Sequence, residues 1–293
     1  MPPPPRCTTM QPIIRYFSAI RRFLQLTPEH RLNYLRRPGC DFTRTSPLSF
    51  ARTVCLIVDL ARQSLAVELA RFFHWQPEDI VTKSAFCQRR KAIAPAFFQD
   101  LFYHSADSFY RCFPQHNRWR GKRLFAVDGT GLKLPNKAAI GQAFGYHHNQ
   151  YAKGPSVRLL PTLDLLNNIL WRVDLHAQDS AEIVHAYQNV AHLPQDGIYI
   201  YDRHYASFGL AYLHQRQGSD FVIRMPLDGA NVVKDFVQSG EQERLIHTKL
   251  SVGRAYRKLN ALGLDPELHS PVDVRMRPSK YRSSRGLGPA MRQ

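Results

Sequence analysis

The sequence predicts an α + α/β protein, with an all-helical N-terminal part followed by a mixed α/β part. Before about residue 115, apolar residues recur at helical spacing, between capping and breaking residues. After residue 123, short apolar runs rich in β-formers alternate with helical stretches, as in an α/β sheet. The polar, basic link at 115–122 separates the two patterns and predicts a domain boundary.

The 293 residues are long enough for two domains, and composition divides them into four parts. We expect a basic, partly disordered N-terminal segment at 1–45, a helical domain at 46–120, a mixed α/β domain at 121–276 and a basic disordered tail at 277–293. In the tail Pro, Ser, Gly and Arg dominate, so nothing there could pack as a core.

The helical part begins with helical patterning around 13–26, without clear boundaries. Four further helices are predicted, at 48–60, 64–74, 82–93 and 96–113. Thr82 can cap the third, which is basic and follows a helix and a turn, as in motifs that place a helix in the DNA major groove. Its candidate DNA-binding residues are Lys83, Gln88, Arg89, Arg90 and Lys91. A charged helix face can equally be only solvated, and these residues leave both interpretations open.

The net charge of +17 is unevenly distributed. Residues 1–120 carry 18 basic against 8 acidic side chains, residues 121–276 carry 17 against 15, and the tail carries 5 basic and no acidic ones. An arginine-rich region beside a balanced one suggests a polyanionic partner, with nucleic acid first and an anionic membrane surface second. A basic protein that is merely soluble remains the alternative.

Cysteine usage and hydropathy bear on the compartment. The five cysteines are widely spaced and contain no C-x-x-C, so neither a disulfide framework nor a zinc site is indicated, and a reducing cytosol fits. The most apolar run, 54–58, is too short to span a bilayer, and residues 1–5 lack the features of a signal peptide. We expect a cytoplasmic protein.

Two predicted strands end on an aspartate. The run Leu124–Val127 leads into Asp128, where Gly129 and Gly131 let the chain turn away. The run Gly197–Tyr201 leads in the same way into Asp202. Two strands that deliver carboxylates to the same end of a sheet can hold a divalent ion between them. Turns also favour aspartate for its own hydrogen bonds, so either residue alone is weak support.

The remaining α/β pattern is regular as far as residue 226. A polar loop at 146–153 is rich in aromatic and basic side chains and is either a nucleic-acid contact or an ordinary surface loop. A β-hairpin at 157–175 turns at Asn167-Asn168. We then expect a helix at 180–191, a helix at 208–216 stopped by Gly218, and a buried strand at 220–225.

Several blocks of residues together resemble DDE-type transposases of bacterial insertion sequences, specifically insertion-sequence family four. The resemblance runs from about Phe42 to Met276. Its blocks are Phe42-Thr43-Arg44 with Leu48-Ser49-Phe50, Lys83-Ser84-Ala85-Phe86 with Arg89-Arg90-Lys91, Val127-Asp128-Gly129-Thr130 with Leu132 and Leu134-Pro135, Tyr201-Asp202-Arg203 with Tyr205 and Phe208, and Asp220-Phe221-Val222-Ile223-Arg224. The family usually has Gly where His204 stands, a departure that could perturb the turn after Asp202.

The resemblance implies an RNase H-like catalytic fold after a helical DNA-binding domain. It implies that Asp128 and Asp202 are the first two carboxylates of an acidic triad that holds two divalent cations, Mg²⁺ or Mn²⁺, and that Arg203 contacts DNA. The partners would be the terminal inverted repeats and target DNA, with no membrane, in a bacterial, nucleoid-associated protein that could self-associate on DNA. One cation would activate water or a 3′-hydroxyl, and the other would stabilise the leaving oxygen.

The third carboxylate is missing from the expected pattern. The family places a glutamate in the signature Y-x2-R-x3-E-x6-K well beyond the second aspartate, and no match follows Asp202. Glu182 lies between the two aspartates, the wrong order for the role, and Glu241, Glu243 and Glu267 lack the companion residues. We therefore expect an incomplete catalytic domain, from a truncated or frameshifted reading frame, and a defective enzyme.

Three functions stay open from the sequence. The first is an insertion-sequence transposase that cleaves DNA and transfers strands, defective without its third metal ligand. The second is a non-catalytic DNA-binding remnant that competes at the element's ends. The third is an unrelated metal-dependent nuclease that uses Asp128 and Asp202.

Overall fold

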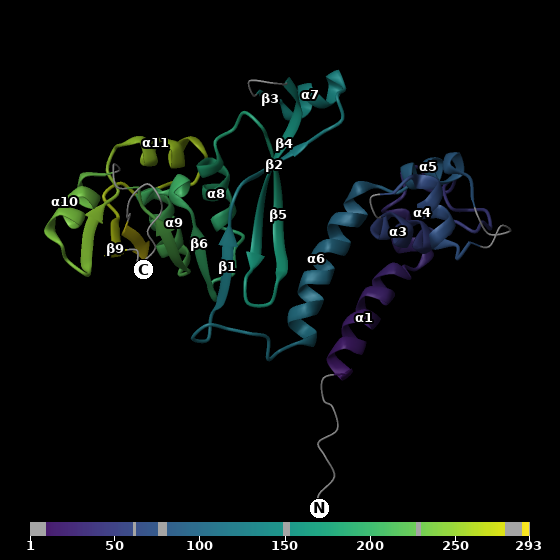
Figure 1. Ribbon diagram of the computed structural model, residues 1–293, viewed down its shortest axis with the longest axis horizontal. Coiled ribbons are helices and arrows are strands. Elements are labelled where there is room, and N and C mark those ends of the chain that lie inside the picture. Colours follow the sequence, from purple (N-terminus) through teal and green to yellow (C-terminus); the bar gives the residue numbers. More distant parts are fainter. Residues whose placement is uncertain are drawn as a thin grey trace, which may run out of the picture. The chain divides into compact units, whose positions relative to one another are not determined.

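A computed structural model describes most of the chain (Figure 1). The described residues are 10–60, 63–75, 81–148, 153–226, 230–278 and 289–292. The chain divides into two compact units, Met1–His116 and Asn117–Gln293. Tyr151, an aromatic residue of the expected polar loop at 146–153, lies outside the described residues.

The first unit is built from helices. They are α1 Met10–Leu24, α2 Pro28–Leu32, α3 Phe50–Asp59, α4 Leu65–Phe72, α5 Lys83–Lys91 and α6 Pro95–Cys112. Side-chain caps fix three of the starts: Thr27 accepts the backbone N–H of His30 at 3.4 Å, Ser49 accepts that of Arg52 at 3.3 Å, and Thr82 accepts that of Ala85 at 3.1 Å. The predicted Thr82 cap is confirmed. Over the part of the chain that can be seen, no helix is long and apolar enough to cross a membrane.

The first unit has an aromatic core. Phe97 on α6 is fully buried, and its ring packs edge-on against Tyr34 and Phe50. Helix α1 packs along α6, where the Tyr16 hydroxyl and Ser105 Oγ are 2.7 Å apart. Residues of the expected N-terminal segment 1–45 therefore contribute to this unit's packing from α1 onward.

The second unit is a mixed α/β structure. Its strands are β1 Arg123–Val127, β2 Thr130–Lys133, β3 Tyr146–His148, β4 Lys153–Asp164, β5 Ile169–Ala177, β6 Gly197–Tyr201, β7 Asp220–Arg224, β8 Arg244–Lys249, β9 Pro271–Pro278 and β10 Pro289–Arg292. Its helices are α7 Ala138–Phe144, α8 Glu182–Val190, the 3-10 helix η1 Arg203–Tyr205, α9 Phe208–Gln217, α10 Asn231–Ser239 and α11 Arg254–Ala261.

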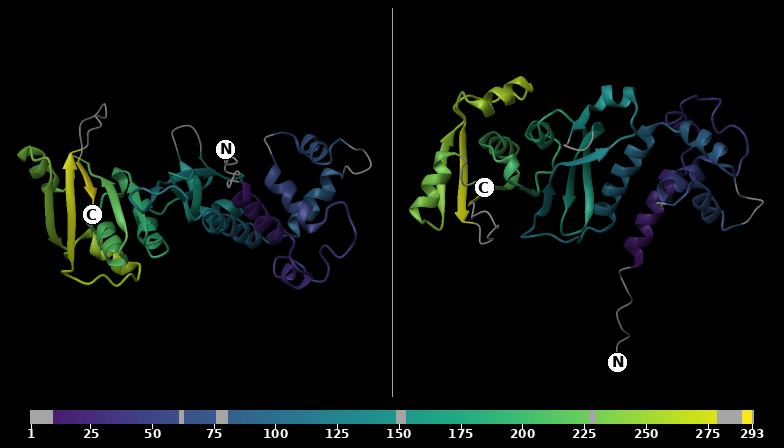
Figure 2. Two further views of the ribbon diagram at one scale, coloured as in Figure 1. Left: turned by 90° about the horizontal axis from the view of Figure 1, so that it is seen from below. Right: turned by 45° about the horizontal axis from the view of Figure 1, so that its top comes forward.

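The strands form one mixed sheet, in the order β2-β4-β1-β6-β7-β10-β9-β8, with β3 and β5 also paired to β4. Strand β1 lies between β4, which is antiparallel to it, and β6, which is parallel. The β4–β5 hairpin turns at Asn168, whose φ of 54° is left-handed, and this confirms the predicted hairpin. At the β8 edge of the sheet, β8 and β9 lie side by side (Figure 2).

Helices cover the sheet and close a large apolar core. Helices α8 and α9 contact each other, and α8 packs on β4 while α9 packs on β7 and β9 (Figure 1). The α9 helix is apolar on most sides, so five consecutive residues from Leu210 to His214 are buried. Gly218 ends it with a φ of 80°, which confirms the predicted stop, because a left-handed cap is nearly free of strain only in glycine.

Two predicted irregular segments contain strands instead. Residues 146–148 of the expected polar loop form β3, which pairs with the start of β4. In the expected disordered tail, residues 277–278 end β9, and 289–292 form β10 between β7 and β9. The expectations are wrong there because backbone N–H and C=O groups can complete a sheet without an apolar side-chain pattern.

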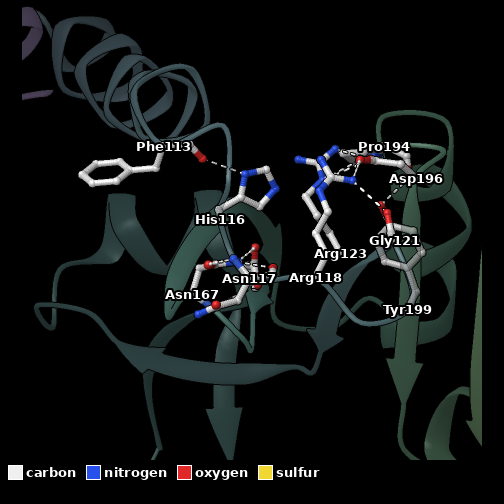
Figure 3. Close-up of polar contacts among 11 residues, drawn as sticks. Phe113, His116, Asn117, Arg118, Gly121, Arg123, Asn167, Pro194, Asp196 and Tyr199 are labelled. Atoms are coloured by element: carbon white, nitrogen blue, oxygen red, sulfur yellow. Dashed lines mark hydrogen bonds and ion pairs between the residues drawn. The ribbon is translucent and has the colours of Figure 1, made fainter. Parts of the chain in front are cut away.

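Polar contacts fix the start of β1 (Figure 3). Asp196, just before β6, accepts hydrogen bonds from Arg118 Nη1 at 2.9 Å and Arg123 Nε at 3.0 Å. Burial acts to raise the pKa of Asp196, but the two arginines lower it below its usual value. Asn117 donates its backbone N–H to Asn167 Oδ1 at 2.9 Å. These contacts hold β1 in register between the hairpin and β6.

A stacked histidine pair joins β5 to α8. The rings of His176 and His185 are parallel, with centroids 3.4 Å apart. Burial, assisted by the neighbouring His176, lowers the pKa of His185 from 6.5 to about 4. The unfolded chain therefore binds more protons than the folded chain between these two pH values. The free energy of unfolding should fall as the pH drops from 6.5 towards 4, and should keep its full value above 6.5.

We expect a His185→Gln variant to show a weaker pH dependence of stability over this window. The measurement is urea unfolding at several pH values from 7.5 to 4.5, where one such proton gives a slope of up to about 1.4 kcal/mol per pH unit. His192→Gln, an exposed histidine, is the matched control. Equal slopes in wild type and H185Q would contradict the assignment.

Candidate active site

The sheet brings Asp128 and Asp202 to the same edge. Strands β1 and β6 are parallel, and Val127 is the register partner of Tyr201. Each aspartate is the next residue, so the two carboxylates leave neighbouring strands at equivalent positions. The juxtaposition that the two strand ends predicted is therefore present in the fold.

The two carboxylates have different surroundings. Asp128 is exposed and accepts the backbone N–H of Gly129 at 2.9 Å. Asp202 caps η1: its Oδ1 accepts the backbone N–H of His204 at 2.8 Å, and its Oδ2 lies 2.8 Å from Nδ1 of the same residue. His204, the departure from the family pattern, thus engages both oxygens of Asp202.

Removing the His204 imidazole should raise the affinity of this edge for divalent cations. A His204→Ala variant keeps the backbone N–H bond but frees Asp202 Oδ2, and a hydrogen bond of this kind has a net strength of about 0.5–1.5 kcal/mol. Because the contact is exposed, we expect a gain of about threefold. A Mn²⁺ titration by calorimetry measures it, with His192→Ala as control. Unchanged or weaker binding would show that the contact does not compete with the cation.

Tyr205 is the last residue of η1, three positions after Asp202. Its side chain is fully buried, and its hydroxyl makes no well-formed hydrogen bond. Burial raises the pKa of Tyr205, and the carboxylates of Glu182, Asp128 and Asp202 raise it further. The three acidic residues therefore share one neighbourhood, with a negative potential that would attract a divalent cation.

Glu182 belongs to this neighbourhood, although its place between the two aspartates in the chain does not match the order of the family's acidic residues. It is the first residue of α8, and it forms an ion pair with Arg158 of β4. A Cβ atom on Gly129 would lie 2.8 Å from the Glu182 carboxyl carbon, so Gly129 admits this carboxylate beside Asp128. Glu182 also lines a cavity of about 310 Å³, together with Lys133, His147 and Ser156 among others.

The side chains at this strand edge supply only some of the ligands that a magnesium ion needs. Within the ranges given above, no three His, Cys, Asp or Glu side chains form a group that could hold a metal ion. Mg²⁺, however, is commonly bound through one or two carboxylates, with water and substrate phosphate oxygens completing its shell. Asp128 and Asp202, side by side at an accessible edge, suit that mode.

The three glutamates that follow Asp202 in the chain have polar partners away from the two aspartates. Glu241 pairs with Arg244, and Glu243 pairs with Arg275 and Arg277. Glu267 Oε2 accepts the Ser270 hydroxyl at 3.4 Å. The geometry therefore gives no support to any of the three as a partner of the two aspartates.

The candidate DNA-binding residues belong to two separate places. Arg203 is exposed in η1, next to Asp202. The others are on α5 in the first unit, where only Phe86 is buried. The α5 residues are Lys83, Gln88, Arg89, Arg90 and Lys91, and all but Arg89, which is half-buried, are exposed.

Comparisons with known proteins agree with the motifs. The family described as "Transposase DDE domain" matches residues 119–267, about half of the chain. InsZ of Escherichia coli strain K12, a protein named as a transposase, is 22% identical over 165 residues, which are 55% of each protein. The transposase InsG for insertion sequence element IS4, from the same strain, is 23% identical over 185 residues, 62% of this chain and 41% of InsG. The chain thus spans about half the length of the curated relatives it matches.

A solved structure was also matched. It is a piggyBac transposase synaptic complex with hairpin DNA, with a TM-score of 0.38 and 11% identity. The match covers 98% of this chain and 52% of that chain. A likeness at this level carries no argument about fold or function.

Proposed function

The chain belongs to the transposase DDE domain family, of the insertion-sequence family four type, and we propose that it binds the terminal inverted repeats of an insertion sequence and acts on their phosphodiester bonds. The observation that carries this proposal is the parallel register of β1 and β6, which sets Asp128 beside Asp202. The proposed partners are the element's ends and target DNA, with self-association on DNA.

We propose an RNase H-like arrangement for the second unit. Three neighbouring parallel strands, β1, β6 and β7, flanked by the antiparallel β4–β5 hairpin, support it, as does the position of the two aspartates at strand ends. The first unit, with its basic α5, is proposed as the DNA-binding domain. A cytoplasmic, nucleoid-associated location follows from a DNA partner and remains part of the proposal.

Asp128 and Asp202 are the residues that would hold Mg²⁺ or Mn²⁺. Bound there, the cation would supply charge stabilisation to a phosphodiester undergoing in-line attack. The exposed Asp128 can reach an incoming strand, and Asp202 is oriented by its bonds to His204. Arg203, exposed beside Asp202, would bind a phosphate close to the reacting bond.

We propose that catalysis is impaired in this sequence, because among the described residues no third carboxylate joins Asp128 and Asp202 in a metal-binding group, and the neighbouring Glu182 is paired with Arg158. A non-catalytic DNA-binding role is therefore the second candidate. The observation that favours it is that the described part of the second unit lacks a three-ligand group. Both candidates predict DNA binding, and only the first predicts cation-dependent cleavage.

The deciding experiment is a gel-shift and cleavage assay with the element's terminal DNA, with and without Mg²⁺. Cation-dependent nicking would support the transposase activity. Binding without nicking would support the DNA-binding role alone. Failure of the wild-type chain to bind DNA would overturn both.

A further inference from the structure

A cavity of about 640 Å³ opens in the first unit, between the segment 37–48 and helix α5. Its wall is largely polar and cationic. The residues that matter for its chemistry are Arg37, Asp41, Thr43, Arg44, Gln88 and Arg89. The two walls are the same stretches that carry the N-terminal blocks of the family resemblance, although they are about 40 residues apart in the sequence.

The cavity has an excess of positive charge. Its single carboxylate, Asp41, is buried and already bound by Arg37, through the backbone N–H at 3.0 Å and Nη2 at 3.1 Å. Within the part of the unit that is described, neither Arg44 nor Arg89 has a carboxylate partner within 4.0 Å. Two guanidinium groups are thus available for an anion.

The position of Arg89 is fixed by an aromatic ring. Its guanidinium carbon lies 4.9 Å from the centroid of the Phe42 ring, which in turn packs edge-on against Phe50. Phe42 has a φ of 57°, an unfavourable backbone conformation for a bulky residue. A stacked guanidinium keeps its N–H edge available, and this edge matches the oxygens of a phosphate.

Only some of the candidate DNA-binding residues of α5 face this cavity. Gln88 and Arg89 line it, whereas Lys83, Arg90 and Lys91 do not. Arg90 instead lies over the Phe86 ring, 6.0 Å from its centroid. Arg44 lies on the opposite wall of the cavity and not on α5. Its substitution should therefore affect a DNA strand bound in the cavity, but not one bound on the outer face of α5.

We propose that this cavity holds the sugar–phosphate backbone of one DNA strand, with Arg44 and Arg89 on its phosphates and Gln88 as a neutral hydrogen-bond donor. The inference deepens the proposed function and rests on it, because it assumes that the first unit binds DNA. Contacts to phosphates carry no base information, so the cavity positions the DNA without selecting its sequence.

The test measures binding of the full-length chain to a random-sequence duplex over a series of KCl concentrations. Arg44→Ala and Arg89→Ala should each weaken binding about tenfold and reduce the slope of log K against log salt by about one. Arg89→Lys keeps the charge but loses the stacked planar group, so a loss of about threefold is expected. Arg36→Ala, an exposed arginine outside the cavity, is the matched control for net charge.

The results of this test distinguish a failure of the cavity proposal from a failure of the proposed function. If R44A binds like R36A while wild type binds DNA, the cavity assignment is overturned and the proposed function stands. A larger loss for Arg90→Ala than for R44A would also overturn it, in favour of the outer face of α5. Absence of any wild-type binding would overturn the proposed function itself.

Discussion

Asp128→Asn should lower the affinity of the second unit for Mn²⁺ by about 100-fold and any cation-dependent strand cleavage by about 1,000-fold. The reason is that the substitution removes one of the two carboxylates that the parallel strands β1 and β6 place side by side. The fold should be unaffected, because Asn Oδ1 can still accept the Gly129 N–H that Asp128 accepts now. Calorimetry and a nicking assay on the full chain measure the two effects.

Asp202→Asn should behave in the same way, and Asp235→Asn on α10 provides the matched control. Asp235 is exposed and undergoes the same chemical change away from the strand edge. DNA binding should be retained in all three variants, because the cavity on the first unit is untouched. Mn²⁺ binding by D128N equal to that of D235N would show that the strand-end aspartates are not the cation site.

Phe97→Ala should destabilise the first unit by about 3–5 kcal/mol, a large share of the stability of a typical domain. The side chain is fully buried, and the aromatic rings of Phe23, Tyr34 and Phe50 pack against it. Truncation leaves a cavity that these rigid rings cannot fill. Urea unfolding followed by circular dichroism measures the loss, and DNA binding should fall in parallel although every basic residue is retained.

Phe98→Ala is the control for this prediction. The residue is adjacent on the same helix but only half-buried, so its truncation should cost markedly less. If the two variants unfold at the same urea concentration, the aromatic cluster around Phe97 is not the centre of the unit's stability.

Much of the fold could be predicted because its signals are local. The Thr82 cap, the Asn167-Asn168 turn and the Gly218 helix stop each depend on hydrogen bonds or backbone angles within a few residues. The alternation of apolar strands and helices likewise predicts a mixed α/β sheet. Where such signals were absent, as in residues 289–292, the strand could not be predicted, because pairing there depends on distant backbone partners.

The amino-acid sequence alone predicts that two strands end on carboxylates and that the helix at 82–93 is rich in basic residues. The residues that lie next to these groups depend on tertiary packing. The packing of α8 brings Glu182 to Gly129, although 53 positions separate the two in the chain, and the turn at Phe42 sets its ring under Arg89. Such meetings depend on strand register and helix packing, which short sequence patterns do not encode.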